Sequence, residues 1–161
     1  MKIKGLAGLL AISGVLVTGC ASTNLRVAKP VTVRPRTVTL TVADHTNANK
    51  LEEEMLGLKE IIADKLEDEG IKVVSNQKDA VSLTGDFLSY DSGNRGLRWL
   101  VGFGLGKATY DSNWKVVSAT GEEMGNCNID GNLKMGFFGG SVSKMHNDMA
   151  EALVDCLKGE N

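Results

Sequence analysis

The sequence contains few of the residues that carry most enzyme chemistry. Its 161 residues include only two histidines, His45 and His146, and three cysteines. Nucleophilic hydrolysis needs a base beside the nucleophile and a group that orients the base. Neither histidine lies in a recognised nucleophile signature, and His146, one position off the apolar stripe of the last predicted helix, is expected to face water. Because Cys-x-x-Cys and His-Glu-x-x-His motifs are also missing, we predict no enzyme activity, catalytic residue, metal site or cofactor.

The sequence also has no excess of basic over acidic residues. Lysine and arginine number 18 against 20 aspartates and glutamates, a formal net charge of −2, which gives no reason to expect nucleic acid as a partner. The glycine-rich motif at 102–107 suggests a phosphate-binding loop, since exposed backbone amides bind anions. A Walker loop, however, has four residues between its glycines and Ser or Thr after its lysine. Three residues separate Gly102 from Gly106, and Ala108 follows Lys107, so we predict no nucleotide site.

The N-terminal hydrophobic run is too short to span a bilayer. It extends from Leu6 to Val17, about a dozen residues, whereas a transmembrane helix takes about 20. Lys2 and Lys4 precede it and small residues follow it. These are the three parts of a secretory signal peptide, which we place at residues 1–19.

The end of this run, Val17-Thr18-Gly19-Cys20, resembles the lipobox of bacterial lipoproteins. The resemblance implies cleavage before Cys20, a diacylglycerol on its thiol and a fatty acid such as palmitate on its new amine. Ala21 and Ser22 follow, where an Asp would retain a lipoprotein of enteric-type bacteria in the inner membrane. By analogy, we expect the periplasmic face of the cell outer membrane. The alternative is an ordinary signal peptide with a chance cysteine.

Two cysteines remain after lipidation, Cys127 and Cys156. Strand alternation puts Cys127 on one face with Ile129 and Leu133, and helical spacing puts Cys156 on a stripe with Met149. Both sulfurs are therefore expected on buried faces. In an oxidising compartment such a pair is typical of a disulfide. Two buried free thiols, or pairing with another molecule, are the alternatives.

The rest of the chain is divided into a tether and one domain. Residues 20–35 are polar and hold both prolines, which predicts a lipid-anchored flexible tether. Alternation marks strands near 37–42, 71–74, 80–90, 107–118 and 123–135, and helical stripes mark 51–66 and 142–158. The order is β-α-β-β-β-β-α. For residues 36–161 we predict a single periplasmic α+β domain, an antiparallel-dominated sheet of about five strands with two helices packed on one face.

The second half of the chain has a distinctive order of motifs. The glycine-rich motif at 101–107 is followed by the turn Ala119-Thr120-Gly121, the segment Phe137-Phe138-Gly139-Gly140 and a closing helix rich in Ala and Leu. Over roughly residues 37–158 this arrangement resembles the bacterial lipoproteins grouped as domain of unknown function 4410. The resemblance implies an uncharacterised envelope lipoprotein and supplies no catalytic residues.

One predicted loop combines glycine with aromatic and basic residues. Its Arg95, Arg98, Trp99 and Phe103 are of the types enriched at protein interfaces, so we expect contact with an envelope protein. A structural bend is the plainer interpretation. Together with the membrane anchor, this predicts a non-catalytic binding or accessory module for an envelope complex. The alternative is a periplasmic carrier or sensor of a small apolar ligand held between sheet and helices.

Overall fold

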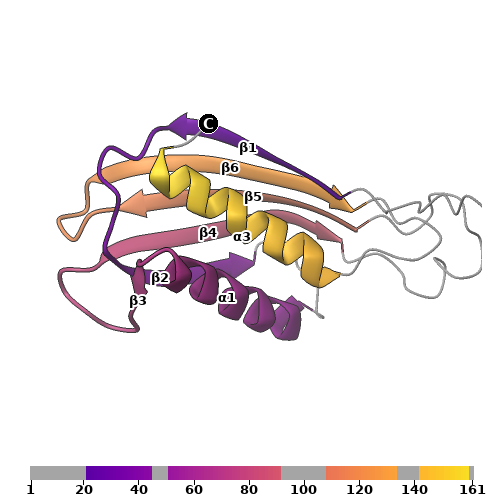
Figure 1. Ribbon diagram of the computed structural model, residues 1–161, viewed down its shortest axis with the longest axis horizontal. Coiled ribbons are helices and arrows are strands. Elements are labelled where there is room, and N and C mark those ends of the chain that lie inside the picture. The colour runs from indigo at the N-terminus through magenta and orange to yellow at the C-terminus, as the bar shows by residue number, and fades with distance from the viewer. Residues whose placement is uncertain (1–20, 45–50, 92–107, 134–141, 160–161) are drawn as a thin grey trace, which may run out of the picture.

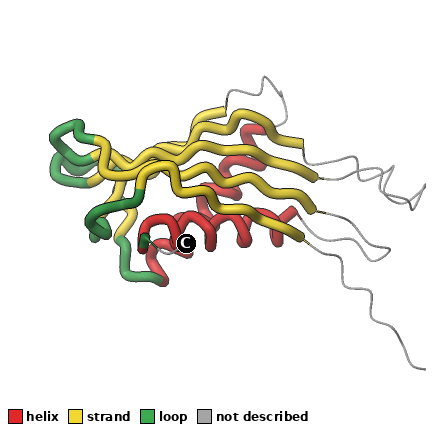
Figure 2. The backbone as a smooth tube through the Cα atoms, turned by 90° about the horizontal axis from the view of Figure 1, so that it is seen from above, coloured by secondary structure: helices red, strands yellow, loops and turns green. Residues whose placement is uncertain are grey.

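One sheet carries two helices on the same face in the computed structural model, which describes residues 21–44, 51–91, 108–133 and 142–159 (Figure 1). The strands are β1 (Ala21–Lys29), β2 (Thr37–Asp44), β3 (Lys72–Val73), β4 (Val81–Asp91), β5 (Ala108–Val117) and β6 (Glu123–Leu133), and the helices are α1 (Leu51–Asp68) and α3 (Val142–Lys158). The six strands lie in the order β1-β6-β5-β4-β2-β3. Figure 2 shows them side by side, with the described turns gathered at one end. The predicted α+β class is confirmed.

Strand β1 corrects the expectation of a flexible tether over residues 20–35. Residues 21–29 pair antiparallel with β6 along the edge of the sheet. Leu25 packs against the core, and beyond the strand Pro35 is buried. The polar composition was misleading because an edge strand with one covered face needs apolar side chains only at alternate positions.

The sheet is mixed rather than simply antiparallel. Strand β2 pairs parallel with both β3 and β4, whereas β1–β6, β4–β5 and β5–β6 are antiparallel pairs. The parallel pairs arise because α1 returns the chain to the end of the sheet where β2 began. The prediction of an antiparallel-dominated sheet of about five strands was therefore right only coarsely.

Helix α1 buries the stripe predicted for it. Leu58, Ile62 and Leu66 are at most 1% exposed against the sheet. Gly70 follows the end of the helix, and its φ of 75° is the left-handed conformation that glycine adopts without strain. The Ile71 N–H then donates to the Leu66 carbonyl at 2.8 Å, as in a Schellman C-terminal cap.

The sheet face under the helices, called here the inner face, pairs glycines with aromatic rings. Gly85 lies opposite Trp114, and Gly131 lies opposite Tyr110. A Cβ at either glycine would stand 2.5 Å from a ring atom of its partner. Because Trp114 is 0% and Tyr110 3% exposed, the rings have no room to move. Glycine is therefore required at both positions.

A disulfide joins the sheet to α3. Cys127 on β6 and Cys156 on α3 are bonded, with their Cα atoms 6.4 Å apart. Both residues are fully buried. The two cysteines that the sequence pairs thus lie at disulfide distance, on the buried faces that their strand and helix periodicities predict.

Candidate functional site

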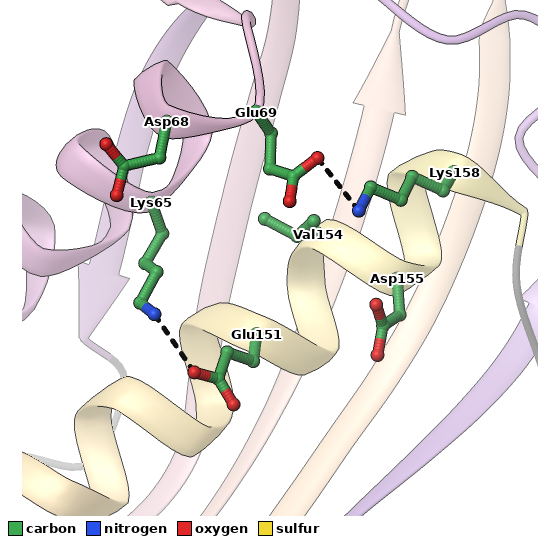
Figure 3. A pocket seen from close by; sticks show the side chains of 7 residues that line it. All are labelled: Lys65, Asp68, Glu69, Glu151, Val154, Asp155 and Lys158. Atoms are coloured by element: carbon green, nitrogen blue, oxygen red, sulfur yellow. Dashed lines mark hydrogen bonds and ion pairs between the residues drawn. The ribbon is translucent and has the colours of Figure 1, made fainter.

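A groove of about 390 Å³ lies between the C-terminal halves of the two helices (Figure 3). All but one of its lining side chains are charged; they are Lys65, Asp68, Glu69, Glu151, Val154, Asp155 and Lys158. Two lysines stand against four carboxylates, so the groove carries a net negative charge. An ionic groove of this kind can bind a cation or brace the two helices, and the contacts inside it decide between these roles.

Two ion pairs cross the groove from helix to helix. Lys65 Nζ lies 2.9 Å from Glu151 Oε1, and Lys158 Nζ lies 2.8 Å from Glu69 Oε2. The hydrogen bond to Glu151 raises the pKa of Lys65, and the hydrogen bond from Lys158 lowers the pKa of Glu69. Lys65 is thus held protonated, which removes the lone pair that a nucleophile or base needs.

Glu69 also binds the segment between β1 and β2. The Arg34 guanidinium lies 3.4 Å from Glu69 Oε2 and donates to the Glu69 carbonyl. One carboxylate therefore joins three parts of the chain that are far apart in sequence. Across the described ranges, no group of three or more His, Cys, Asp or Glu side chains is placed to hold a metal ion. We assign the groove a bracing role.

His146 is the site residue that the sequence misplaced. It is 6% exposed, and its Nε2 lies 3.0 Å from the Tyr90 hydroxyl on β4. The expectation that it faces water was wrong because the face of α3 that packs on the sheet is wide enough to include His146 beside Tyr90. Two helical stripes are buried as a result, and the second runs through His146, Ala150, Leu153 and Leu157. That spacing is visible in the sequence and was the missed signal.

The opposite face of the sheet, called here the open face, is covered by neither helix and is polar. Its side chains include Asn24, Arg26, Thr41, Thr84, Asp86, Asp111, Asn113, Lys115, Asn126, Asn128 and Asp130. They bond mainly to one another. Asn113 Nδ2 donates to Asn126 Oδ1 at 3.0 Å, and Arg26 lies 3.0 Å from Asp130. Among its described residues, this face is a polar surface, and it shows no convergence of catalytic groups.

The remaining predicted site residues, Cys20, Arg95, Arg98, Trp99 and Phe103, lie outside the described residues. The strands that flank them are described, however. The register puts Ala21, Leu133 and Ala108 side by side on β1, β6 and β5. The end of β4 and the start of β5, which flank segment 92–107, therefore lie at the end of the sheet where β1 begins. Neither described helix is long and apolar enough to cross a membrane.

Comparisons with known proteins identify solved structures with a similar fold and the family of the chain. Two crystal forms of PelC from Paraburkholderia phytofirmans, both dodecamers and one a point variant, have TM-scores of 0.53 and 0.55 at 15% and 13% sequence identity. Each match covers 88% of this chain and 99% or 100% of PelC, so the likeness is one of fold. No curated protein matches. The family model for domain of unknown function 4410 matches residues 31–136, and the chain belongs to that family.

Proposed function

We propose that the protein is a non-catalytic accessory module of an envelope complex, held by lipid on Cys20 at the periplasmic face of the outer membrane, and that it works as a self-associated oligomer. The observation that carries the proposal is the one-sided sheet. Two helices cover the inner face, whereas β1 and most of β2 keep free outer edges within the described part of the chain. Long uncovered edges of this kind are either protected or paired with another strand.

The fold comparison supports self-association. PelC has this fold over nearly its whole length and is a dodecamer. At 13–15% identity its interfaces cannot be transferred residue by residue. We therefore carry over only the propensity of this architecture to assemble, as a proposal for this chain.

The start of β1 supports a short connection to the membrane. Because the strand begins at Ala21, a lipid on Cys20 would leave no spacer between the acyl chains and the sheet. Stable anchoring takes about two acyl chains, which a lipidated N-terminal cysteine supplies. Segment 92–107, with the predicted contact residues Arg98 and Trp99, would then meet its partner close to the membrane.

The alternative, a carrier of a small apolar ligand, has less support. The groove between the helices is lined by charge, which does not suit such a ligand. On the inner face the largest buried side chains include Trp114 and Phe87, both 0% exposed. A native mass spectrum of the purified protein decides this point, since a carrier would retain a bound small molecule.

The direct test uses the full chain, extracted from membranes in mild detergent. Light scattering with refractometry gives the protein mass of the assembly, and intact mass spectrometry gives the modification of its N-terminus. We expect a defined oligomer whose subunits begin at Cys20 and carry lipid. A monomer at all concentrations would overturn self-association, and a mature chain without lipid would overturn the anchor.

A further inference from the structure

The two edges of the sheet differ in a way that lets one copy of the chain pair with another. Strand β1 forms one edge over residues 21–29. At the other edge, β3 covers β2 only at Thr37 and Val38. Residues 39–44 of β2 therefore form a second free edge, within the described part of the chain.

The backbone groups at this second edge point outward. The Val38 carbonyl accepts a hydrogen bond from the Val74 N–H at 2.9 Å, on the β3 side. Because backbone groups alternate along a strand, Leu40 and Val42 direct their N–H and C=O groups to the same side. Beyond β3 these groups have no strand beside them in the described sheet, and each is a donor or acceptor that a further strand would satisfy.

The strand directions fit a head-to-tail arrangement. Strand β1 runs opposite to β2, as the arrows in Figure 1 show. Two copies placed side by side in the same orientation therefore bring β1 of one copy antiparallel to β2 of the next. We infer that copies of this chain join in this way, residues 21–29 of one copy pairing with residues 39–44 of its neighbour. The inference rests on the self-association proposed above and specifies its interface.

The position of the anchor favours this pairing over a symmetric one. In a two-fold pairing of β1 with β1, the strands are antiparallel, and the Ala21 ends would lie about 30 Å apart at opposite ends of the joined sheet. Lipids on the two Cys20 residues would then leave in opposite directions. The head-to-tail pairing keeps every Ala21 at the same end, where all the lipids can enter one membrane. A heterologous contact of this kind closes into a ring when the rotation between copies allows it.

The strand register predicts which residues of two neighbouring copies would lie opposite each other. Arg26, Asn128, Asn113, Asp86 and Ala43 form one row across β1, β6, β5, β4 and β2. If neighbouring copies form one continuous sheet without a shift along the strand direction, Arg26 therefore lies opposite Ala43 of the next copy. Within one copy the same two residues are four strand spacings apart, about 19 Å. A short cross-linker between these positions thus reports only contacts between copies.

Helix α1 presents an apolar side chain toward the same neighbour. Leu56 is 64% exposed. It lies nine residues before Lys65, which binds Glu151 of α3, and at about 100° per residue this puts Leu56 on the opposite side of the helix. That side overhangs the β2 edge, where α3 of the next copy would pack.

The test uses cysteine variants of the full chain in detergent, treated with a short bis-maleimide. The native cysteines do not interfere, since Cys127 and Cys156 are bonded to each other and Cys20 carries lipid under the proposed function. Arg26→Cys combined with Ala43→Cys should give a ladder of dimers, trimers and larger products. Each single variant should give none, and a mixture of the two single variants should stop at dimers. Lys115→Cys, exposed in the middle of the open face, is the control and should give no product.

The outcomes distinguish failure of the proposed interface from failure of the proposed self-association. Dimers from Arg26→Cys alone would overturn the inference in favour of the two-fold pairing. A double variant that light scattering shows to be oligomeric, yet that gives no ladder, would overturn the edge pairing and leave the proposed function standing. Wild-type chain that is monomeric under the same conditions would overturn both. As an independent readout, Leu56→Gln should lower the association constant several-fold without changing the unfolding transition.

Discussion

The inner and open faces of the sheet are formed by alternate residues of the same strands, and they differ in how their side chains are packed. On β5, Ser112 and Trp114 are 0% exposed under the helices, while Asn113 between them points to the open face. The inner face is filled by close, specific contacts that leave no room for added atoms. The open face consists of polar side chains, several of which bond to each other. We infer that the inner face determines stability, and that association depends on the edges where the sheet stops.

The largest expected change in the free energy of unfolding comes from loss of the disulfide, which links α3 to the inner face. Replacing Cys127 and Cys156 together with alanine frees a loop with a sequence separation of 29 residues. The chain-entropy model predicts a loss of about 3–4 kcal/mol in the free energy of unfolding. Urea unfolding followed by circular dichroism measures it. A loss below about 1 kcal/mol would show that inner-face packing alone holds the helix.

Gly85→Ala is the next most severe change. Its Cβ would stand 2.5 Å from the Trp114 ring, and overpacking of a filled core costs about 3 kcal/mol. The matched control is Gly57→Ala on α1, where a Cβ has nothing within 4 Å. That variant should gain up to about 1 kcal/mol, because alanine is the better helix former. Equal unfolding midpoints for the two variants would contradict the account of the inner face.

Neighbouring residues on the two faces give the cleanest comparison. Ser112 Oγ donates to the Ile129 carbonyl at 2.9 Å and accepts from Trp114 Nε1 at 3.0 Å. Ser112→Ala leaves the buried Trp114 Nε1–H without its acceptor, removes one hydrogen bond to the Ile129 carbonyl, and should cost about 2 kcal/mol. Asn113→Ala, one residue on, should cost about 0.5 kcal/mol or less. Both values come from urea unfolding at neutral pH, and a reversed order would mean that the open face is not simply a polar surface.

The effect at Tyr110 is smaller than those at the disulfide, Gly85 and Ser112, and it depends on pH. Its hydroxyl lies 3.0 Å from Thr23 Oγ1 on β1, so Tyr110→Phe should cost about 1 kcal/mol at pH 8. Burial raises the pKa of Tyr110 from 10.0 to about 12. Because the pKa is higher in the folded than in the unfolded protein, the tyrosine destabilises the fold as pH rises from 10 toward 12. The advantage of the wild type over the variant should therefore shrink in that range, and a difference independent of pH would contradict the burial of this hydroxyl.

The sequence predicted the inner face well because that face is periodic. The stripe through Leu58, Ile62 and Leu66 and the alternation through Leu83, Gly85 and Phe87 each lie within one element. Local spacing is then sufficient evidence. The same holds for Cys127 and Cys156, whose buried phases were visible in their own strand and helix. The sequence could not give the distance between them.

What the sequence did not predict depends on residues far apart in the chain. β1 looks polar by itself, and it becomes a strand only because β6, about a hundred residues later, supplies its hydrogen bonds. The ion pairs of Glu69 with Arg34 and Lys158 likewise need the folded chain. The burial of His146 follows from the packing of α3 on β4, where Tyr90 lies against it. No local pattern determines which strand lies beside which, so the order of the strands was also beyond prediction.

Hydrogen exchange at the sheet edges tests the central claim most directly. The full chain is measured in its assembled form and again after dilution to the monomer, with mass spectrometry resolving β1 and residues 39–44 of β2. We predict slow exchange at both edges in the assembly and fast exchange at both in the monomer, while β4 and β5 stay protected throughout. Edges that exchange as fast in the assembly as in the monomer would contradict the account, because the copies would then be joined by some other surface.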